Sequence, residues 1–312
     1  MGFDLDALRA AVAAHGRVTR VVIARIEGSS PREVGAAMLL WDGGQSGTIG
    51  GGALELMATQ EAQNARTDRL STHVLGPDLG QCCGGRITLL HEVYDAGRLA
   101  ALMAHDVIAR AVDGSPMPLS VKRVLSRARA QGVRPQSQLH QGWMIEPVHR
   151  PETPLWIWGA GHVGRALVDV LAPLPDLAIT WVDTAPQRFP DKIPAGVTSV
   201  PAARPEMLVP HAPPRARHLI LTYSHVLDLE LCHALLSHGF ASCGLIGSAT
   251  KWARFRTRLT ALGHSIASIS SINCPIGQPE LGKHPQAIAI GVAGEILNAT
   301  ERKIPQYKDK TG

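Results

Sequence analysis

The residues best suited to chemistry in this 312-residue chain are two adjacent cysteines, Cys82 and Cys83, set between glycines. A trans peptide holds neighbouring Cα atoms about 3.8 Å apart, whereas a disulfide prefers about 5.5 Å, so we expect two thiols. The flanking glycines leave them unshielded, and Arg86 could favour a thiolate, a soft ligand suited to soft metals or to sulfur transfer. In an extended segment only one of the two would enter a given pocket. The alternative is a pair of small buried core residues.

Two glycine-containing loops precede the cysteines. Gly50, Gly51 and Gly52 stand directly before an expected helix, where their backbone N–H groups could approach a ligand closely. A tight strand-to-helix turn would explain them equally well. The segment 27–32 (EGSSPR) has ordinary turn chemistry, but Arg32 could also offer a fixed guanidinium to an oxyanion.

A third loop follows the apolar stretch 155–158 and opens a helix. It has the spacing Gly159-x-Gly161-x-x-Gly164, which suits a tight turn, close backbone approach to a phosphate, and close helix–strand packing. The helix N-terminus would supply free N–H groups to that phosphate. His162 either contacts the anion or caps the turn. The alternative is a degenerate Rossmann domain that packs without a ligand.

Polar residues at later strand ends could complete this site. Asp183 ends the next expected strand about 20 residues past the loop, where a Rossmann acid meets ribose hydroxyls. His225 and Asp228, three residues apart at a helix start, could form an acid/base or ligand pair. Helix capping, with Asp228 opposing the helix dipole, explains them as well.

Composition limits the function classes. Hydrophobic residues at 45% and charged residues at 18% are ordinary for a soluble globular protein. No apolar run reaches the roughly 18 residues that span a bilayer, and the N-terminus lacks a signal-peptide pattern, so we expect a cytoplasmic protein. A net charge of +5 with 4% aromatic residues argues against nucleic-acid binding. Five cysteines without an even disulfide framework fit a reducing compartment.

These patterns predict an α/β protein. A smaller α+β N-terminal domain, residues 1–112, contains strands at 17–26, 36–41 and 86–94 and a helix at 54–69. Residues 113–153 are rich in Pro, Gln and Arg and are predicted to be a linker with a short strand near 142–148. Strands then alternate with helices over 154–302, which indicates a C-terminal Rossmann-like domain with a parallel sheet. Residues 303–312 are a polar tail.

Taken together, the motifs resemble those of the XdhC/CoxI family, in the family's order and across nearly the whole chain. The matching stretches are EGSSPREVGAAML, GTIGGGALE, LGQCCGG, WIWGAGHVGRAL, TYSHVLDLELC, GLIGSATKWARFRTRL and PIG…KHPQAIAIGVAGEIL.

The resemblance implies a chaperone for the molybdenum cofactor, not an enzyme. Family members hold this phosphate-bearing pterin while a cysteine desulfurase replaces an oxo ligand with sulfur. They then deliver it to the molybdenum-binding subunit of xanthine dehydrogenase. On this reading Cys82 or Cys83 contacts the molybdenum or its terminal sulfur, and the glycine loops surround the cofactor.

The competing hypothesis is an NAD(P)-dependent oxidoreductase that uses the Gly159–Gly164 loop with Asp183 and the His225/Asp228 pair. It gives the adjacent cysteines no role. The sequence leaves open whether a nucleotide also binds, where the cofactor sits, and whether the protein is a homodimer.

Overall fold

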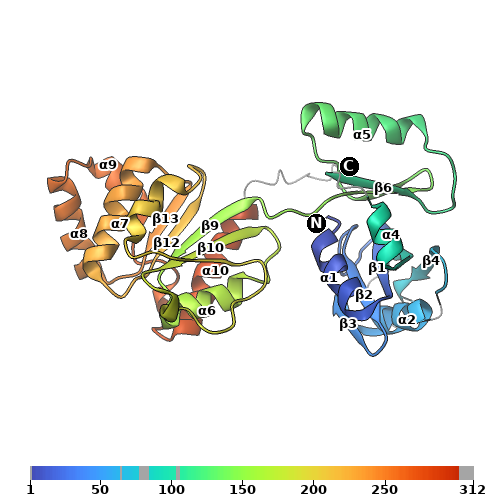
Figure 1. Cartoon of the computed structure of the whole chain (residues 1–312), viewed down its shortest axis with the longest axis horizontal. Helices are drawn as coiled ribbons and strands as arrows, with labels where there is room; N and C mark the ends of the chain where they lie inside the picture. Colours follow the sequence, from blue (N-terminus) through green and yellow to red (C-terminus); the bar gives the residue numbers. More distant parts are fainter. Residues whose placement is uncertain (1, 64, 77–83, 103–105, 302–312) are drawn as a thin grey trace. The chain divides into compact units, whose positions relative to one another are not determined.

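The computed structural model describes residues 2–63, 65–76, 84–102 and 106–301. The chain divides into two compact units, an N-terminal unit (Met1–Arg150) and a C-terminal unit (Pro151–Gly312). Figure 1 labels their helices and strands.

The N-terminal unit is built on an antiparallel sheet of five strands in the order β3-β2-β1-β5-β4. Its strands are β1 (Val18–Glu27), β2 (Ala37–Trp41), β3 (Gly44–Gly47), β4 (Arg69–Val74) and β5 (Arg86–Tyr94). The central strand β1 is buried over its first seven residues, because both faces of the sheet are covered. Val21 and Ile23 pack against helix α2 (Gly52–Gln63), whereas Val22 and Ala24 pack toward Met144. Because side chains alternate along a strand, β1 contributes residues to two separate hydrophobic cores.

Helix α1 (Leu5–His15) lies before β1. The Asp4 side chain caps it by accepting a hydrogen bond from the Ala7 N–H at 2.9 Å, and Gly16 ends it with a φ of 76°. Its apolar side packs Leu8 and Val12 into a cluster with Tyr94. Helix α4 (Ala96–Ala101) follows β5.

The prediction that residues 113–153 form a linker is wrong, because this segment is folded into the N-terminal unit. Strand β8 (Trp143–Pro147) pairs with both β6 (Val107–Ala111) and β7 (Gln138–His140) in a second, three-stranded sheet. Helix α5 (Leu119–Gln131) carries the basic residues of this segment on its exposed side and packs Val121 against the sheet. Arg123, Arg127 and Arg129, which contributed to the composition that suggested a linker, lie on this solvent-facing side.

Buried charges join the two sheets of the N-terminal unit. Glu146 on β8 contacts the Arg20 guanidinium on β1 through two hydrogen bonds of 2.7 and 3.1 Å. Glu92 on β5 contacts Arg20 at 2.8 Å, and Arg110 on β6 contacts both carboxylates. The Phe3 ring lies 4.4 Å from the Arg20 Cζ and 4.9 Å from the Arg110 Cζ. Two guanidiniums and two carboxylates thus balance one another inside the protein.

The C-terminal unit is a parallel sheet of six strands in the order β11-β10-β9-β12-β13-β14. This confirms the predicted Rossmann-like domain. The strands are β9 (Thr153–Trp158), β10 (Leu177–Asp183), β11 (Thr198–Pro201), β12 (Arg217–Ile220), β13 (Ser242–Leu245) and β14 (Ile272–Asn273).

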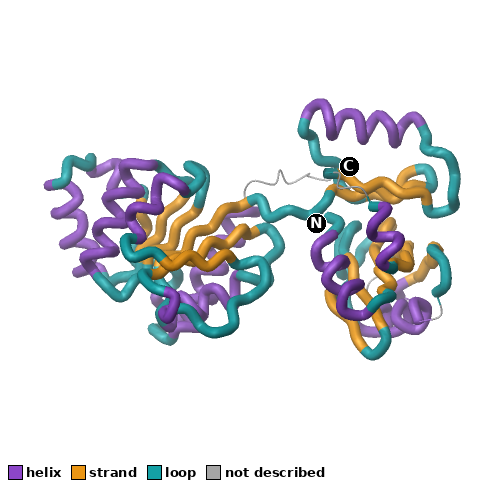
Figure 2. The backbone as a smooth tube through the Cα atoms, in the orientation of Figure 1, coloured by secondary structure: helices purple, strands orange, loops and turns teal. Residues whose placement is uncertain are grey.

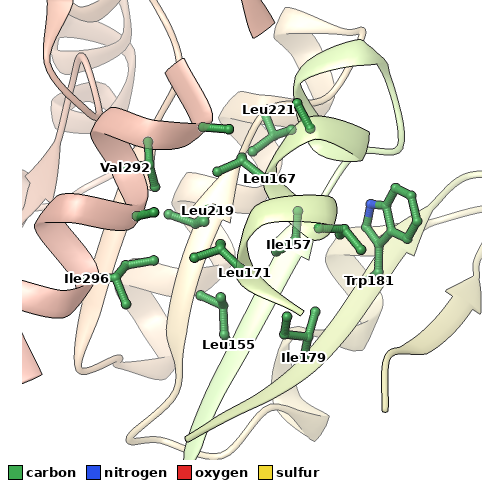
Figure 3. Packing of buried hydrophobic residues seen from close by; sticks show 14 of the residues in the cluster. Leu155, Ile157, Leu167, Leu171, Ile179, Trp181, Leu219, Leu221, Val292 and Ile296 are labelled. Carbon is green, nitrogen blue, oxygen red and sulfur yellow. The ribbon is translucent and has the colours of Figure 1, made fainter. Parts of the chain in front are cut away.

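Helices cover both faces of this sheet, as Figure 2 shows. They are α6 (His162–Leu171), α7 (His225–His238), α8 (Ala249–Ala261), α9 (Ile266–Ile269) and α10 (Pro285–Glu301), with short 3₁₀ turns η1 (Pro186–Arg188), η2 (Pro205–His211) and η3 (Pro279–Leu281). One core lies under α6 and α10, where Leu167 and Val292 meet the strand residues Ile157 and Leu219 (Figure 3). The other lies under α7 and α8.

None of the helices that the structure describes combines the length and apolar character needed to cross a membrane.

Candidate functional site

The candidate site lies at the carboxyl ends of the parallel strands β9 and β12. Within the sheet, β10 is the neighbour of β9 on one side and β12 is its neighbour on the other side. Such a reversal of strand order opens a crevice between the following loops, and ligands of open α/β sheets bind there. The loop after β9 is the Gly159–Gly164 loop, and the loop after β12 contains Thr222 to His225.

Packing explains two of the three motif glycines. A Cβ on Gly159 would lie 2.4 Å from the Leu221 carbonyl oxygen, and this residue has a φ of +121°. A Cβ on Gly164 would lie 2.1 Å from the Gly159 carbonyl oxygen. Both positions exclude side chains, because the two loops and helix α6 touch through their backbones.

Gly161 has a different environment. A Cβ there would meet nothing within 4 Å, so the backbone faces open space. Gly161 is also the N-cap of α6, and no side chain among the described residues caps this helix. The first N–H groups of α6 therefore have no side-chain cap among the described residues, and a helix start of this kind can bind an anion. His162, the first residue of the helix, is exposed beside Gly161.

Asp183 holds the glycine loop in place. It is 3% exposed, and one carboxylate oxygen accepts a hydrogen bond from the Ala160 N–H at 2.6 Å. The other oxygen accepts from the Thr184 N–H at 2.6 Å and from the Arg188 Nε at 3.2 Å. Both oxygens that were predicted to accept hydrogen bonds from ribose hydroxyls thus already have protein partners.

The predicted pairing of His225 with Asp228 is not formed. His225 is exposed at the start of α7, where Ser224 caps the helix. Asp228 is fully buried and turns inward, accepting hydrogen bonds from the Thr222 N–H at 3.1 Å and the Lys251 Nζ at 2.5 Å. A buried carboxylate is most stable beside a cation, and Lys251 on α8 supplies it.

Two residues beside the crevice, Lys251 and Tyr223, were not predicted from the sequence. Lys251 lies three residues after Ser248, the N-cap of α8, and no local pattern links it to Asp228. Tyr223 is 65% exposed at the crevice, and the Arg188 Cζ lies 4.5 Å from the centre of its ring. The signal available in the sequence was an aromatic residue, Tyr223, shortly after the expected strand, since residues at strand ends beside a switch point contact ligands.

In the N-terminal unit, the loop of three glycines wraps around a carboxylate of the same chain. The Ile49, Gly50 and Gly51 N–H groups donate to one oxygen of Glu55, at 2.9, 3.3 and 2.9 Å. Burial alone would raise the pKa of Glu55, but these hydrogen bonds and one from Thr48 lower it below its usual value. The loop therefore favours a negative group, and Glu55 occupies that place. Gly52 is the first residue of α2.

The loop over residues 27–32 meets both the glycine loop and the described end of the third loop. A Cβ on Gly50 would lie 2.6 Å from the Pro31 ring, and one on Gly85 would lie 2.0 Å from the Ser29 carbonyl oxygen. The Arg32 guanidinium lies 3.4 Å from both the Thr48 carbonyl oxygen and the Glu33 carboxylate. The three loops singled out in the sequence thus converge, up to the described end of the third.

Cys82 and Cys83, the predicted contacts to molybdenum or its terminal sulfur, lie outside the described residues. The described cysteines have a different character. Burial raises the pKa of the Cys232 and Cys243 thiols well above the ordinary range, so both are protonated core residues. Burial also raises the pKa of half-buried Cys274, to about 11. Among the described residues, no group of three or more His, Cys, Asp or Glu side chains is arranged to hold a metal ion.

Fold and site define a protein with a Rossmann-type unit, an uncapped glycine loop at its switch point, and a separate antiparallel unit. Two family models match it: the XdhC Rossmann domain over residues 155–296 and the XdhC and CoxI family over residues 11–75. The chain belongs to the XdhC/CoxI family.

Two known proteins are similar to this chain. A crystal structure described as a xanthine dehydrogenase from Bacillus halodurans matches with a TM-score of 0.69 and 20% identity, covering 98% of each chain. That likeness concerns the fold. The uncharacterized protein YqeB of Escherichia coli K12 is 26% identical over 278 residues, which are 86% of this chain. The match spans 41% of the length of YqeB.

Proposed function

We propose that this protein is an accessory factor in the maturation of xanthine dehydrogenase and acts there as a chaperone for the molybdenum cofactor. The observation that carries the proposal is the uncapped N-terminus of α6, with open space at Gly161, in a chain of the XdhC/CoxI family. The cofactor is a pterin with a terminal phosphate, and free N–H groups at a helix start suit a phosphate.

The residues of the crevice fit such a group. The Gly161 and His162 N–H groups would receive the phosphate, and exposed His162 and His225 could add contacts. Tyr223, backed by Arg188, offers a flat surface for a planar ring. When bound, the cofactor supplies the molybdenum centre, whereas the protein binds, orients and shields it.

The proposal includes transfer of the cofactor without catalytic turnover. A chaperone must release its cargo, and release rates are governed by the sum of weak contacts. The buried pair of Asp228 and Lys251 serves to hold the loops after β12 and β13 together, through contacts with Thr222 and the Ile246 carbonyl oxygen. The proposed partners are a cysteine desulfurase, which supplies sulfur, and the molybdenum-binding subunit of xanthine dehydrogenase, which receives the cofactor. A homodimer would be compatible with this role.

The NAD(P)-dependent oxidoreductase remains the second candidate, since a Rossmann loop binds dinucleotides as well. The engagement of both Asp183 oxygens weighs against it, because a nicotinamide site needs that carboxylate for the ribose.

Anaerobic purification from cells that make the cofactor tests the proposal. We expect near-stoichiometric pterin and molybdenum in the wild-type protein. Gly161→Asp, which places a carboxylate at the phosphate position, should lose both, and Gly161→Ala should keep both. Retention of pterin by Gly161→Asp, or micromolar NADH binding without any pterin, would show the proposal to be wrong.

Single replacements of the adjacent cysteines test the thiol contact. Cys82→Ala or Cys83→Ala should reduce reconstitution of cofactor-free xanthine dehydrogenase, while the pterin still binds through its phosphate. If both variants transfer sulfurated cofactor as well as the wild type does, neither thiol is a contact.

A further inference from the structure

The N-terminal unit contains a cleft of about 740 Å³ that the proposed function does not use. It lies where the end of α1, the start of β1, the end of β2 and the segment after α2 meet. Cofactor-sized ligands occupy pockets of roughly 300 to 1,000 Å³. A lone phosphate would fill a small part of this volume, so the cleft suits a larger molecule.

One wall of the cleft is aromatic. The His15 and Trp41 rings are stacked in parallel, with their centres 4.2 Å apart and an angle of 5° between their planes. His15 is the exposed member of the pair and lines the cleft. A planar ring laid on the imidazole would therefore extend an existing stack without moving either side chain.

The charge of the cleft is positive. Arg17 and Arg66 both line it and both are exposed, against one lining carboxylate, Asp42. The Arg17 Nη2 donates a hydrogen bond to the Ala65 carbonyl oxygen, which fixes the guanidinium at the cleft. Arg66 makes no ion pair with any residue that the structure describes.

We propose that this cleft binds a nucleoside phosphate. The base would stack on His15, and the phosphates would lie against Arg17 and Arg66. Guanidiniums suit this task, because their planar donor geometry matches phosphate oxygens. Thr19, a buried threonine that lines the cleft, adds a hydroxyl for the ligand. The site lies wholly within the N-terminal unit and is independent of the crevice at Gly161.

Calorimetric titration of the full-length protein tests the proposal, with ATP and GTP as probes and with adenosine and inorganic pyrophosphate as fragments. We expect each nucleotide to bind at least about tenfold more tightly than either fragment. Arg66→Ala should weaken nucleotide binding about tenfold or more, because it removes a charge-assisted contact. His15→Ala should weaken it several-fold, and His15→Phe should restore it through the stack.

Two control variants make the outcome decisive. Arg123→Ala removes an exposed arginine on α5 outside the cleft and should leave nucleotide affinity unchanged. Gly161→Asp should also leave it unchanged, whatever it does to pterin binding. Absence of nucleotide binding at millimolar concentration refutes the proposal, as does pyrophosphate binding as tight as that of ATP. Loss of nucleotide binding in Gly161→Asp but not in Arg66→Ala would place the nucleotide in the Rossmann crevice and also refute it.

Discussion

Replacing Glu146 with glutamine should destabilise the N-terminal unit strongly. Glu146 is fully buried and contacts the guanidiniums of both Arg20 and Arg110. The substitution keeps the side-chain shape but leaves two buried guanidiniums against one carboxylate, that of Glu92. Removal of one partner from a buried ion pair costs about 3 to 5 kcal/mol. Since a domain is stable by about 5 to 15 kcal/mol, we expect a loss of about a fifth of the stability or more.

Hydrogen exchange read by mass spectrometry is the suitable assay, because it follows each unit separately in the intact protein. Peptides from β1 and β5 should lose protection in Glu146→Gln, whereas peptides from the C-terminal unit should not. Asp106→Asn is the matched control, since Asp106 pairs with Arg150 at 3.0 Å on the surface, where an ion pair contributes at most about 1 kcal/mol. If Glu146→Gln lowers the stability of the N-terminal unit no more than this control does, the buried cluster does not hold the two sheets together.

Three further results are expected. Gly164→Ala should lower the free energy of unfolding of the C-terminal unit by about 1 to 3 kcal/mol in urea titrations, because its Cβ would overlap a carbonyl oxygen; Gly161→Ala should change it by under about 0.5 kcal/mol. Asp228→Asn should cost about 3 kcal/mol or more, because it leaves the Lys251 ammonium buried without a counter-charge; a cost below about 1 kcal/mol would contradict this. Burial opposes ionisation of Glu92, but Arg110 and Arg20 outweigh it and lower its pKa to about 2 from an ordinary 4.5. The folded-state pKa is the lower one, so the stabilisation is complete above about pH 4.5 and is lost as the pH falls toward 2. Exchange measured across this range should show the loss in the wild type and a weaker pH dependence in Glu92→Gln.

Local patterns in the sequence predicted much of the fold. The strand expected at 86–94 is β5, and the alternation of strands and helices after residue 154 gives the parallel sheet. The helix expected over 54–69 is shorter, since α2 ends at Gln63 and β4 begins at Arg69. The short strand expected near 142–148 is β8, whereas α5 and β7 were missed, because β7 has three residues and polar residues dominate the composition of α5.

The candidate site was predicted in part. The glycine spacing located the loop, because it is typical of a tight turn that leads from a strand into a helix. The contact of Gly159 with Leu221 depends on the tertiary structure. The sequence could not show that Glu55 fills the loop of three glycines, since any of several acidic residues might have done so. Nor could it show that Arg188 would lie over Tyr223, 35 positions later in the chain.

By itself, then, the sequence determined the class of each unit, the position of the phosphate-type loop and the family to which the chain belongs. These features depend on the types of residues and their spacing along the chain, which are fixed before the chain folds. Tertiary structure alone decided which charges meet. Arg20 pairs with Glu92 and Glu146, which lie 72 and 126 positions later in the chain. Asp228 pairs with Lys251, 23 positions later. Such pairs depend on how strands and helices pack, because a buried charge is stable only beside the partner that packing brings to it.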